Sequence, residues 1–468
     1  MATRHRRDTW TRRLRSSLHR RGGYPKSPAG GVRGSNGRLR QKRMTEAVSV
    51  EKEGQESQPH SGEPLAPSFV AVDFFCGAGG TTRGLIDAGG YVVAGVDKDD
   101  RCRETYVRNN KNESLDCEEP EFLQRDIFPR TADYQAGEQG RLYGELLELI
   151  AAKRKMAPGV PLLFAICAPC QPFTTLSRKE LSDGRKRGRE RDRGLLQQAV
   201  KFVRRLKPEV VLSENVAGIR DPRYGGVWDD FKKSLEDLGY ATGTKIVCTS
   251  KFGVPQFRKR SIMAAVRRDL VVEECFTDTA QGELLIPDCD ASALVKSVKE
   301  AIEHLPPITA GELHETIPNH RARTLSATNL KRLASAQPGQ SNAYMAETKD
   351  GDLSLGCHRR LNERMGVRCF TDVYTRMSPD RPSPTITTKC HSISNGRFGH
   401  YDTSQLRGIS LREAAILQSF PEEYVFYPKD RVETVARMIG NAVPPKLAQF
   451  FASYLVKSMD TTPRAQEY

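Results

Sequence analysis

The chain has 468 residues, of which 38% are hydrophobic and 28% charged, as in soluble globular proteins. It contains no run of 18 apolar residues, so no membrane span is predicted. The formal charge of +15 is concentrated in residues 1–43, which hold 12 Arg and 2 Lys against the single acid Asp8. The remainder carries 59 basic and 57 acidic groups. A nucleic-acid surface on the folded part must therefore come from local clustering of charge.

Residues 1–64 lack an apolar period and are rich in Arg, Gly and Ser, which predicts disorder. Three interpretations compete for this segment: a basic arm that holds phosphates, an Arg-rich targeting peptide, or translated upstream sequence with the natural start at Met44. We favour the last because the composition changes abruptly there. The eleven cysteines follow no framework spacing, which predicts a reducing compartment without disulfides.

Order is expected to begin at residues 68–75, a β-like run followed by the turn Cys76-Gly77-Ala78-Gly79-Gly80 and a helix. Strand, glycine-rich turn and helix is the arrangement that binds nucleotide cofactors, because small residues let the backbone approach the ligand. Thr82 stands where a dinucleotide fingerprint has its third glycine, which tells against a dehydrogenase.

Two acids follow at the ends of further short segments. Asp97 ends the strand predicted over residues 91–96, where it could accept hydrogen bonds from ribose hydroxyls or cap a helix. Asp126 occupies a similar place farther along. Asp97 is therefore a candidate for the cofactor side of a site at the carboxyl edge of a sheet.

Cys170 lies just after an apolar run, residues 162–166, that predicts a buried strand. Pro169 and Pro172 flank it and stiffen the turn, which suits a nucleophilic thiol. The pair Cys167 and Cys170 is also formally a C-x-x-C, typical of a redox couple or half a zinc site, and many cysteines are simply buried apolar groups. The basic segment 178–193 is predicted to be a mobile loop able to close on a polyanion, or else a solvated loop.

A second buried strand, Val210–Leu212, is expected to end at Ser213-Glu214-Asn215-Val216. An acid at that end of a neighbouring strand can face the same crevice as Cys170, which makes Glu214 a general-acid candidate. Farther along, alternation places Gln256, Arg258 and Arg260 on one face of a strand. That row could grip phosphate and orient a nearby acid, or could blunt an exposed sheet edge.

The periodicity weakens from about residue 270 to 400, where proline, glycine and polar residues predict a loop-rich second domain. Regular structure returns with a capping box at Ser410-Leu411-Arg412-Glu413, followed by an apolar helix over residues 447–455.

Together these stretches resemble the DNA (cytosine-5) methyltransferase family. The motifs that carry the resemblance occur in the family's usual order and span roughly residues 69–456: Phe74-Phe75-Cys76-Gly77-Ala78-Gly79-Gly80, Pro169-Cys170-Gln171-Pro172, Glu214-Asn215-Val216, Gln256-Phe257-Arg258-Lys259-Arg260 and Gly440-Asn441-Ala442-Val443-Pro444. The resemblance implies an α/β, doubly wound (Rossmann-like) S-adenosylmethionine-dependent methyltransferase fold with a smaller loop-rich target-recognition domain. It implies a catalytic and cofactor domain over 65–269, target recognition over 270–400, a returning segment over 401–457 and a tail over 458–468.

The resemblance also assigns roles. Cys170 would add to C6 of cytosine, Glu214 would protonate or hydrogen-bond N3, and Arg258 and Arg260 would hold the O2 of the base and Glu214. The cofactor, S-adenosylmethionine, would be bound by Phe75, Gly77, Gly79, Asp97, Asp126 and Asn441. The substrate would be contacted by Gln256, Asn215, Arg178, Arg185 and Arg187. No metal is implied. The family often has Glu in place of Asp97 and an apolar or aromatic residue in place of Lys98.

The implied substrate is a cytosine flipped out of duplex DNA. The chain is similar to prokaryotic or phage modification enzymes, which implies a cytoplasmic, nucleoid-associated monomer, with a restriction endonuclease for the same site as a further expected partner. One alternative is a tRNA cytosine-5 methyltransferase. The stretch from Pro169 through Thr174 and the run Cys369-Phe370-Thr371 resemble motifs of that branch of the family. The other is a catalytically silent DNA-binding relative, which the presence of Cys170 and Glu214 disfavours.

Overall fold

The computed structural model of the chain describes residues 66–173, 183–277 and 282–459. Residues 1–64, which are predicted to be disordered, lie outside the described residues, and so do residues 460–468 of the predicted tail. All eleven cysteines fall within them, and each is a free thiol.

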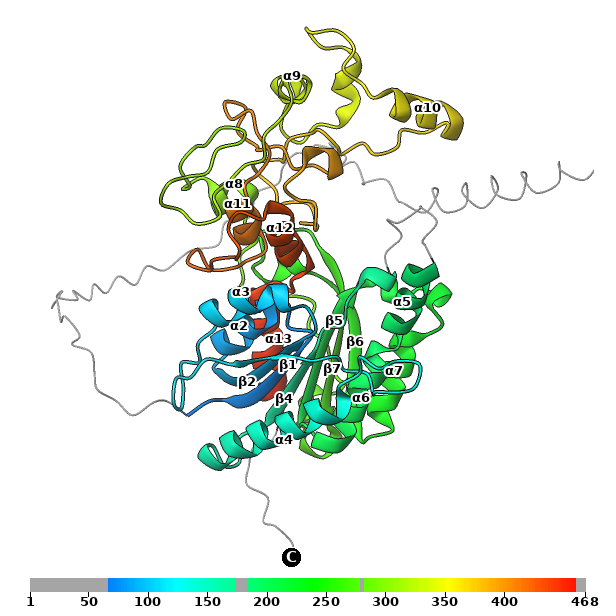
Figure 1. Cartoon of the computed structure of the whole chain (residues 1–468), viewed down its shortest axis with the longest axis vertical. Coiled ribbons are helices and arrows are strands. Elements are labelled where there is room, and N and C mark those ends of the chain that lie inside the picture. Colours follow the sequence, from blue (N-terminus) through cyan, green and yellow to red (C-terminus); the bar gives the residue numbers. More distant parts are fainter. Residues whose placement is uncertain (1–65, 174–182, 278–281, 460–468) are drawn as a thin grey trace, which may run out of the picture. The chain divides into compact units, whose positions relative to one another are not determined.

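A seven-stranded sheet in the order β3-β2-β1-β4-β5-β7-β6 organises the described chain (Figure 1). The first five strands of that order run parallel, and β7 is antiparallel to both β5 and β6. The chain leaves β1 toward β2 on one side and returns to β4 on the other, so the strand order reverses between β1 and β4. The predicted doubly wound α/β fold is confirmed. The strands are β1 (Phe69–Phe74), β2 (Gly90–Asp97), β3 (Glu121–Gln124), β4 (Leu162–Ile166), β5 (Val210–Val216), β6 (Tyr240–Cys248) and β7 (Lys259–Arg267).

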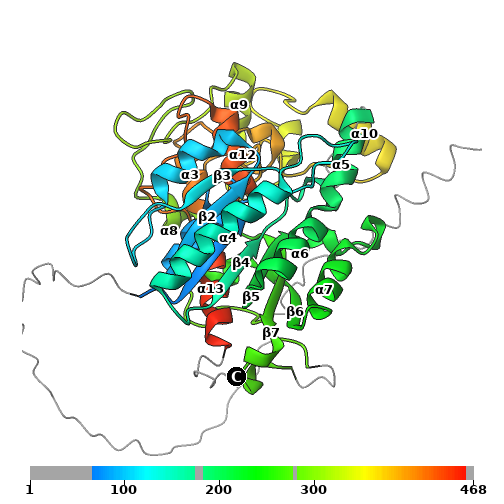
Figure 2. The same cartoon turned by 60° about the horizontal axis from the view of Figure 1, so that its bottom comes forward.

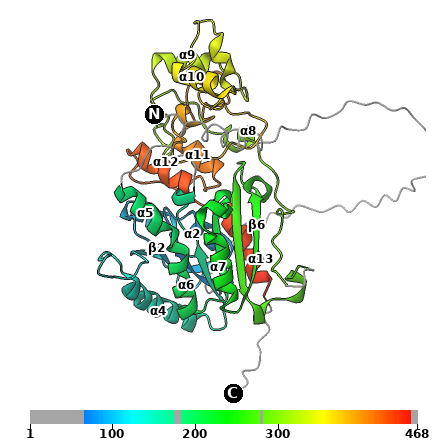
Figure 3. The ribbon, with the colours of Figure 1, turned by 90° about the vertical axis from the view of Figure 1, so that its right-hand side faces the viewer.

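Helices cover both faces of the sheet (Figure 2). One face packs against α4 (Gln139–Met156), α6 (Leu195–Leu206) and α7 (Val227–Glu236), and the other against α2 (Gly80–Asp87) and α13 (Pro445–Lys457). Figure 3 shows α13 on the opposite side of β6 from α7. Both faces are buried, which explains why the parallel strands read as continuous apolar runs.

The end of the chain packs against its first helix. A Cβ on Gly84 of α2 would lie 2.3 Å from the carbonyl oxygen of Pro445 in α13, so only glycine lets these helices approach so closely. Helices from opposite ends of the described chain are thereby brought into the same layer.

Between residues 270 and 400 the described chain is mostly loop, with isolated β-bridges and short helices. The predicted capping box is confirmed at the start of α11, where Ser410 and Glu413 exchange their hydrogen bonds. Glu413 also forms a buried ion pair with Arg407, with Nη2 2.7 Å from Oε1. The helices here and nearby are α3 (Arg103–Asn109), α8 (Val298–Ile302), α9 (Ala327–Ser335), α10 (Gly356–Met365), α11 (Leu411–Leu417) and α12 (Val432–Asn441).

Two predictions about local structure are wrong. The basic segment predicted as a loop over 178–193 contains a helix, α5, from Asp183 to Arg193. Opposite charges stabilise it locally, since Arg193 pairs with Glu190 one turn away at 3.0 Å. The strand predicted to carry Gln256 and Arg258 begins only at Lys259. The alternation itself holds, because residues 256, 258 and 260 are buried while 257 and 259 are exposed.

Candidate active site

Cys170 lies on a turn that follows β4, next to the loop that follows β1. The amide of Cys167 donates to the carbonyl of Phe74 at 3.4 Å, which joins the two loops. Asn215, on the neighbouring strand β5, donates from Nδ2 to the carbonyl of Ala168 at 2.9 Å. The turn is closed by the amide of Phe173, which donates to the carbonyl of Cys170 at 2.9 Å. The thiol is thus held at the point where ligands bind in this class of sheet.

The electrostatic surroundings of Cys170 are mixed. Burial raises the pKa of the Cys170 thiol, Arg260 lowers it, Glu214 raises it and Arg258 lowers it. The resting thiol is therefore protonated near neutral pH. A thiolate at this position forms when a proton acceptor or a further positive charge comes close.

Glu214 and Arg260 form a close ion pair beside this thiol. Arg260 Nε lies 2.6 Å from Glu214 Oε1, and the two side chains are 9% and 11% exposed respectively. In the antiparallel register Arg260 of β7 pairs with Val216 of β5, two residues from Glu214. This diagonal position brings the side chains of Glu214 and Arg260 together. Glu214 lies near the carboxyl end of β5, which runs to Val216.

Three residues predicted to contact substrate are buried and occupied by other contacts. Gln256 donates to Gln418 Oε1 at 2.7 Å and accepts from the amide of Ile386 at 2.8 Å. Arg258 does not face phosphate; it donates to the carbonyls of Ile386 at 2.8 Å and Gly440 at 3.1 Å. Burial lowers the pKa of Arg258 to about 9. Asn215 is 1% exposed, and its amide is used by the Cys170 turn. These residues fix the frame around the site.

The predicted cofactor residues gather at the ends of β1 and β2. The amide of Phe75 donates to the carbonyl of Val96 at 2.7 Å, and the amide of Gly77 donates to Asp97 Oδ2 at 2.9 Å. Asp97 Oδ1 accepts from the amide of Asp99 at 2.8 Å, so Asp97 braces two loops and caps no α-helix. Burial raises the pKa of Asp97.

The two glycines of the first loop differ in their surroundings. Gly77 has φ +51°, and a Cβ built on it meets no atom within 4 Å, so the loop is open above it. Gly79 has φ +89°, and a Cβ there would lie 2.4 Å from Asn110 Nδ2. Packing inside the protein therefore requires Gly79, while the open space at Gly77 suits the close approach of a ligand.

Asp126 and Asn441 flank this region from other elements. Asp126 Oδ2 accepts from the Tyr134 hydroxyl at 2.6 Å, and Oδ1 accepts from the amide of Phe128 at 3.0 Å. Asn441 is exposed at the end of α12. The donors and acceptors at Gly77, Asp97 and Asp126 fit a nucleoside with a charged tail, because two carboxylates lie where hydroxyl and amino groups could reach them.

Only part of the predicted DNA-binding loop can be placed. Arg178 lies outside the described residues, and so does the side chain of Arg185, whose backbone is in α5. Arg187 is exposed on α5.

Two residues near the site escaped prediction. Asp73 is fully buried in β1, and burial raises its pKa to about 7. The Thr82 hydroxyl donates to Asp73 Oδ2 at 2.7 Å and so ties β1 to the first turn of α2. An acid inside an apolar run was a usable signal for Asp73. Tyr134 had no signal, because its contact with Asp126 depends on how the intervening loop folds.

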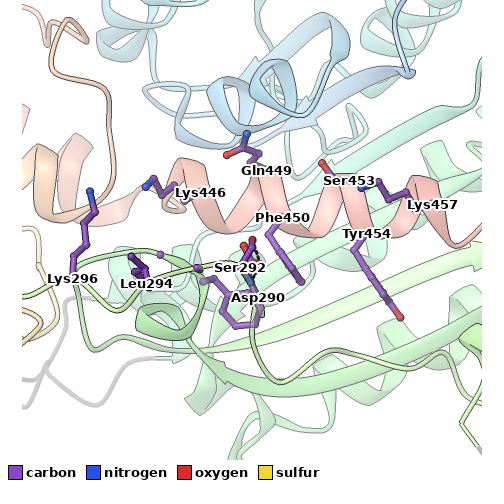
Figure 4. A pocket seen from close by; sticks show the side chains of 13 residues that line it. Asp290, Ser292, Leu294, Lys296, Lys446, Gln449, Phe450, Ser453, Tyr454 and Lys457 are labelled. Atoms are coloured by element: carbon purple, nitrogen blue, oxygen red, sulfur yellow. Dashed lines mark hydrogen bonds between the residues drawn. The ribbon is translucent and has the colours of Figure 1, made fainter. Parts of the chain in front are cut away.

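In the described ranges no three His, Cys, Asp or Glu side chains gather as a metal site requires, and no helix is long and apolar enough to cross a membrane. A zinc site at Cys167 and Cys170 therefore lacks its other ligands there. A separate pocket of about 670 Å³ lies between α13 and residues 290–296, with Lys446, Phe450 and Tyr454 along its helix side (Figure 4). None of the predicted site residues lines it.

The sequence matches the profile of the family described as C-5 cytosine-specific DNA methylase over residues 69–134 and 150–457. The chain belongs to this family. It is a DNA cytosine-5 methyltransferase that uses S-adenosylmethionine, as predicted.

Relatives in the family share most of the chain's length. Type II methylase M.HgiDII of Herpetosiphon aurantiacus is 31% identical over 393 residues, which cover 84% of this chain and 96% of that protein. Type II methyltransferase M1.HphI of Haemophilus parahaemolyticus is 26% identical over 393 residues, covering 83% and 87%. A solved structure, of a putative DNA modification methyltransferase encoded within an E. coli prophage, has a TM-score of 0.55 at 20% identity, covering 83% of this chain and 99% of that one. That likeness concerns the fold.

Proposed function

We propose that this methyltransferase modifies C5 of a cytosine within a specific duplex DNA sequence, through a covalent bond between Cys170 and C6 of a flipped base. The observation that supports the proposal best is the position of Cys170 beside the ion pair of Glu214 and Arg260, at the end of neighbouring strands. Cytosine C5 is too weak a nucleophile to take a methyl group unaided. Addition of a thiolate to C6 moves the C5=C6 electron pair onto C5.

The residues around Cys170 have distinct parts in this scheme. Glu214 protonates or hydrogen-bonds N3 of the base, which offsets the negative charge that develops on the ring. Arg260 orients Glu214 by their contact at 2.6 Å. S-adenosylmethionine supplies the electrophilic methyl group. Loss of the C5 proton then restores the C5=C6 bond and expels Cys170 as a thiolate.

The cofactor is bound, in this proposal, by the loops after β1 and β2. Phe75 lies against the adenine, Asp97 accepts from the ribose hydroxyls, and Asp126 accepts from the adenine amino group. Gly77 gives the methionine end room to approach, and Asn441 completes that end. The free space at Gly77 supports this arrangement.

Residues 270–400 form the target-recognition domain in this proposal, and residues 401–457 return to the catalytic domain. Basic side chains of α5, with Arg187 exposed on its surface, meet DNA phosphates. The enzyme acts as a monomer associated with the nucleoid in a type II restriction–modification system, beside an endonuclease that cuts the same sequence. The names of the relatives support this setting.

The test is transfer of tritiated methyl from S-adenosylmethionine to duplex DNA and, separately, to bulk tRNA, followed by bisulfite sequencing of the labelled DNA. We expect label in DNA at one sequence. Cys170→Ser should abolish transfer and retain cofactor binding, while Cys289→Ser, at an exposed position, should keep full activity. Label in tRNA alone would replace DNA by RNA as the substrate. Exchange of residues 270–400 with those of a relative should move the labelled sequence; an unmoved sequence would contradict the recognition assignment.

A further inference from the structure

Two consecutive residues at the end of α5 reach the two loops that carry the predicted cofactor acids. The guanidinium carbon of Arg191 lies 4.2 Å from the centre of the Tyr134 ring, whose hydroxyl donates to Asp126 Oδ2 at 2.6 Å. The next residue, Asp192, lies 3.9 Å from Nζ of Lys98, which directly follows Asp97. The contacts of Arg191 with Tyr134 and of Asp192 with Lys98 thus join one turn of α5 to the carboxyl edge of the sheet.

The same helix end also reaches the Cys170 turn. The guanidinium carbon of Arg193 lies 5.7 Å from the centre of the Tyr224 ring, which meets Phe173 edge-on at 5.4 Å. Phe173 closes the turn by its hydrogen bond to the carbonyl of Cys170. One turn of helix therefore touches the cofactor side through Arg191 and the cysteine side through Arg193.

We propose that Tyr134 and Arg191 are positioning residues that couple cofactor binding at Asp126 to α5, and through α5 to DNA. The inference rests on the proposed function, in which Asp126 accepts from adenine and α5 meets DNA. Tyr134 contacts Asp126 through its hydroxyl and Arg191 through its ring, so a single side chain links the cofactor acid to α5. Burial and the neighbouring Asp126 raise the pKa of Tyr134 to about 12, which keeps the hydroxyl a hydrogen-bond donor across the working range of pH.

The contact can transmit a change because the Arg191 guanidinium lies against the ring whose hydroxyl donates to Asp126. The Nε of Arg191 is buried without a hydrogen-bond partner, and the guanidinium carbon lies 4.2 Å from the centre of the Tyr134 ring and 6.0 Å from that of Phe128. Each carboxylate oxygen of Asp126 accepts one hydrogen bond and can accept a second, so an adenine amino group can bind while Tyr134 stays in place. A cofactor that fixes Asp126 therefore also fixes Tyr134 beneath Arg191.

Coupling of this kind is reciprocal, so the cofactor should tighten DNA binding by the factor by which DNA tightens cofactor binding. The experiment measures the dissociation constant of S-adenosylhomocysteine on the full chain by calorimetry, with and without the duplex identified by bisulfite sequencing. Tyr134→Phe removes the hydroxyl and keeps the ring, whereas Arg191→Gln removes the cation. The control is Arg223→Gln, because Arg223 is an exposed arginine that pairs with Asp221.

We expect each variant to reduce the DNA-induced gain in cofactor affinity by about threefold or more, in the range of one hydrogen bond or one cation–π contact. The double variant should lose no more than the larger single loss, because the two residues act in one chain of contacts. Arg223→Gln should keep the wild-type gain. Equal weakening of cofactor binding with and without DNA would overturn the inference, since it would mark a local role only. A wild-type enzyme that binds S-adenosylhomocysteine and DNA independently would also overturn it, whereas failure to bind S-adenosylhomocysteine at all would overturn the proposed function.

Discussion

Cys170 lies between opposite charges, and removing them one at a time should move its reactivity in opposite directions. Burial holds the pKa of the thiol above its ordinary value, Arg260 lowers it and Glu214 raises it. Arg260→Met should therefore raise the pKa of Cys170 further, and Glu214→Gln should lower it. Alkylation by iodoacetamide at a fixed pH should slow in the first variant and accelerate in the second, because the thiolate is the reactive form.

The size of the effect follows from the geometry of the pair. Opposite charges 2.6 Å apart largely cancel at a third group, so removing one exposes Cys170 to the full field of the other. We expect the thiolate fraction at any pH below the pKa to change about tenfold, downward in Arg260→Met and upward in Glu214→Gln. The double variant should return toward the wild-type rate.

The assay is alkylation across pH 6 to about 10, with each cysteine followed by mass spectrometry of its peptide. Cys289 is exposed and serves as the internal control, since its rate should not respond to either substitution. The wild-type rate at Cys170 should rise tenfold per pH unit through neutrality without a plateau. Two single variants that shift Cys170 in the same direction, or a wild-type plateau near pH 7, would refute this account of the thiol.

Three further predictions concern the frame of the site. Arg407→Met should destabilise the fold by about 3–5 kcal/mol in denaturant unfolding, because it leaves Glu413 buried without its cation; a loss below about 1 kcal/mol would show that the pair is dispensable. Asp73 has a folded pKa of about 7 against an ordinary 3.8, so its contribution to stability is present below pH 4 and lost as the pH rises to 7. Asp73→Asn should accordingly gain up to roughly 4 kcal/mol over the wild type at pH 8 and little at pH 4, and a gap that does not change with pH would exclude Asp73 as the titrating group. Gly84→Ala should lower the melting temperature by several degrees, since its Cβ would strike a backbone oxygen at 2.3 Å; unchanged melting would mean that α2 and α13 separate easily.

The sequence was most informative where a residue's role depends on its own neighbours in the chain. The apolar runs predicted β1, β4 and the start of β5. Cys170 could be found because two prolines and a buried strand surround it in sequence. Glu214 could be found because it follows the apolar part of the next strand.

Prediction failed where charge patterns and distant contacts decide the structure. The basic residues before Arg193 suggested a loop, but the ion pair of Arg193 with Glu190 and the stacking of Arg191 on Tyr134 stabilise α5. Composition alone cannot separate a solvated loop from a helix whose ends are anchored elsewhere. The contact between Tyr134 and Asp126 likewise depends on a loop whose path no local signal specifies.

The row of residues 256, 258 and 260 combines both cases, because alternation predicts a shared face and says nothing about what that face meets. Arg260 faces Glu214 on the neighbouring strand, while Arg258 and Gln256 bind Ile386, on the stretch that leaves the proposed recognition domain. The amide of Phe257, between them, donates to the carbonyl of Ser383 at 2.8 Å. Within five consecutive residues, Arg260 thus contacts the general-acid candidate, while Gln256, Phe257 and Arg258 bind the stretch that leaves the proposed recognition domain. Substitutions at Arg258 should therefore disturb DNA recognition and catalysis together, because they move the proposed recognition domain relative to the catalytic site. Substitutions at Arg260 should act on the chemical step.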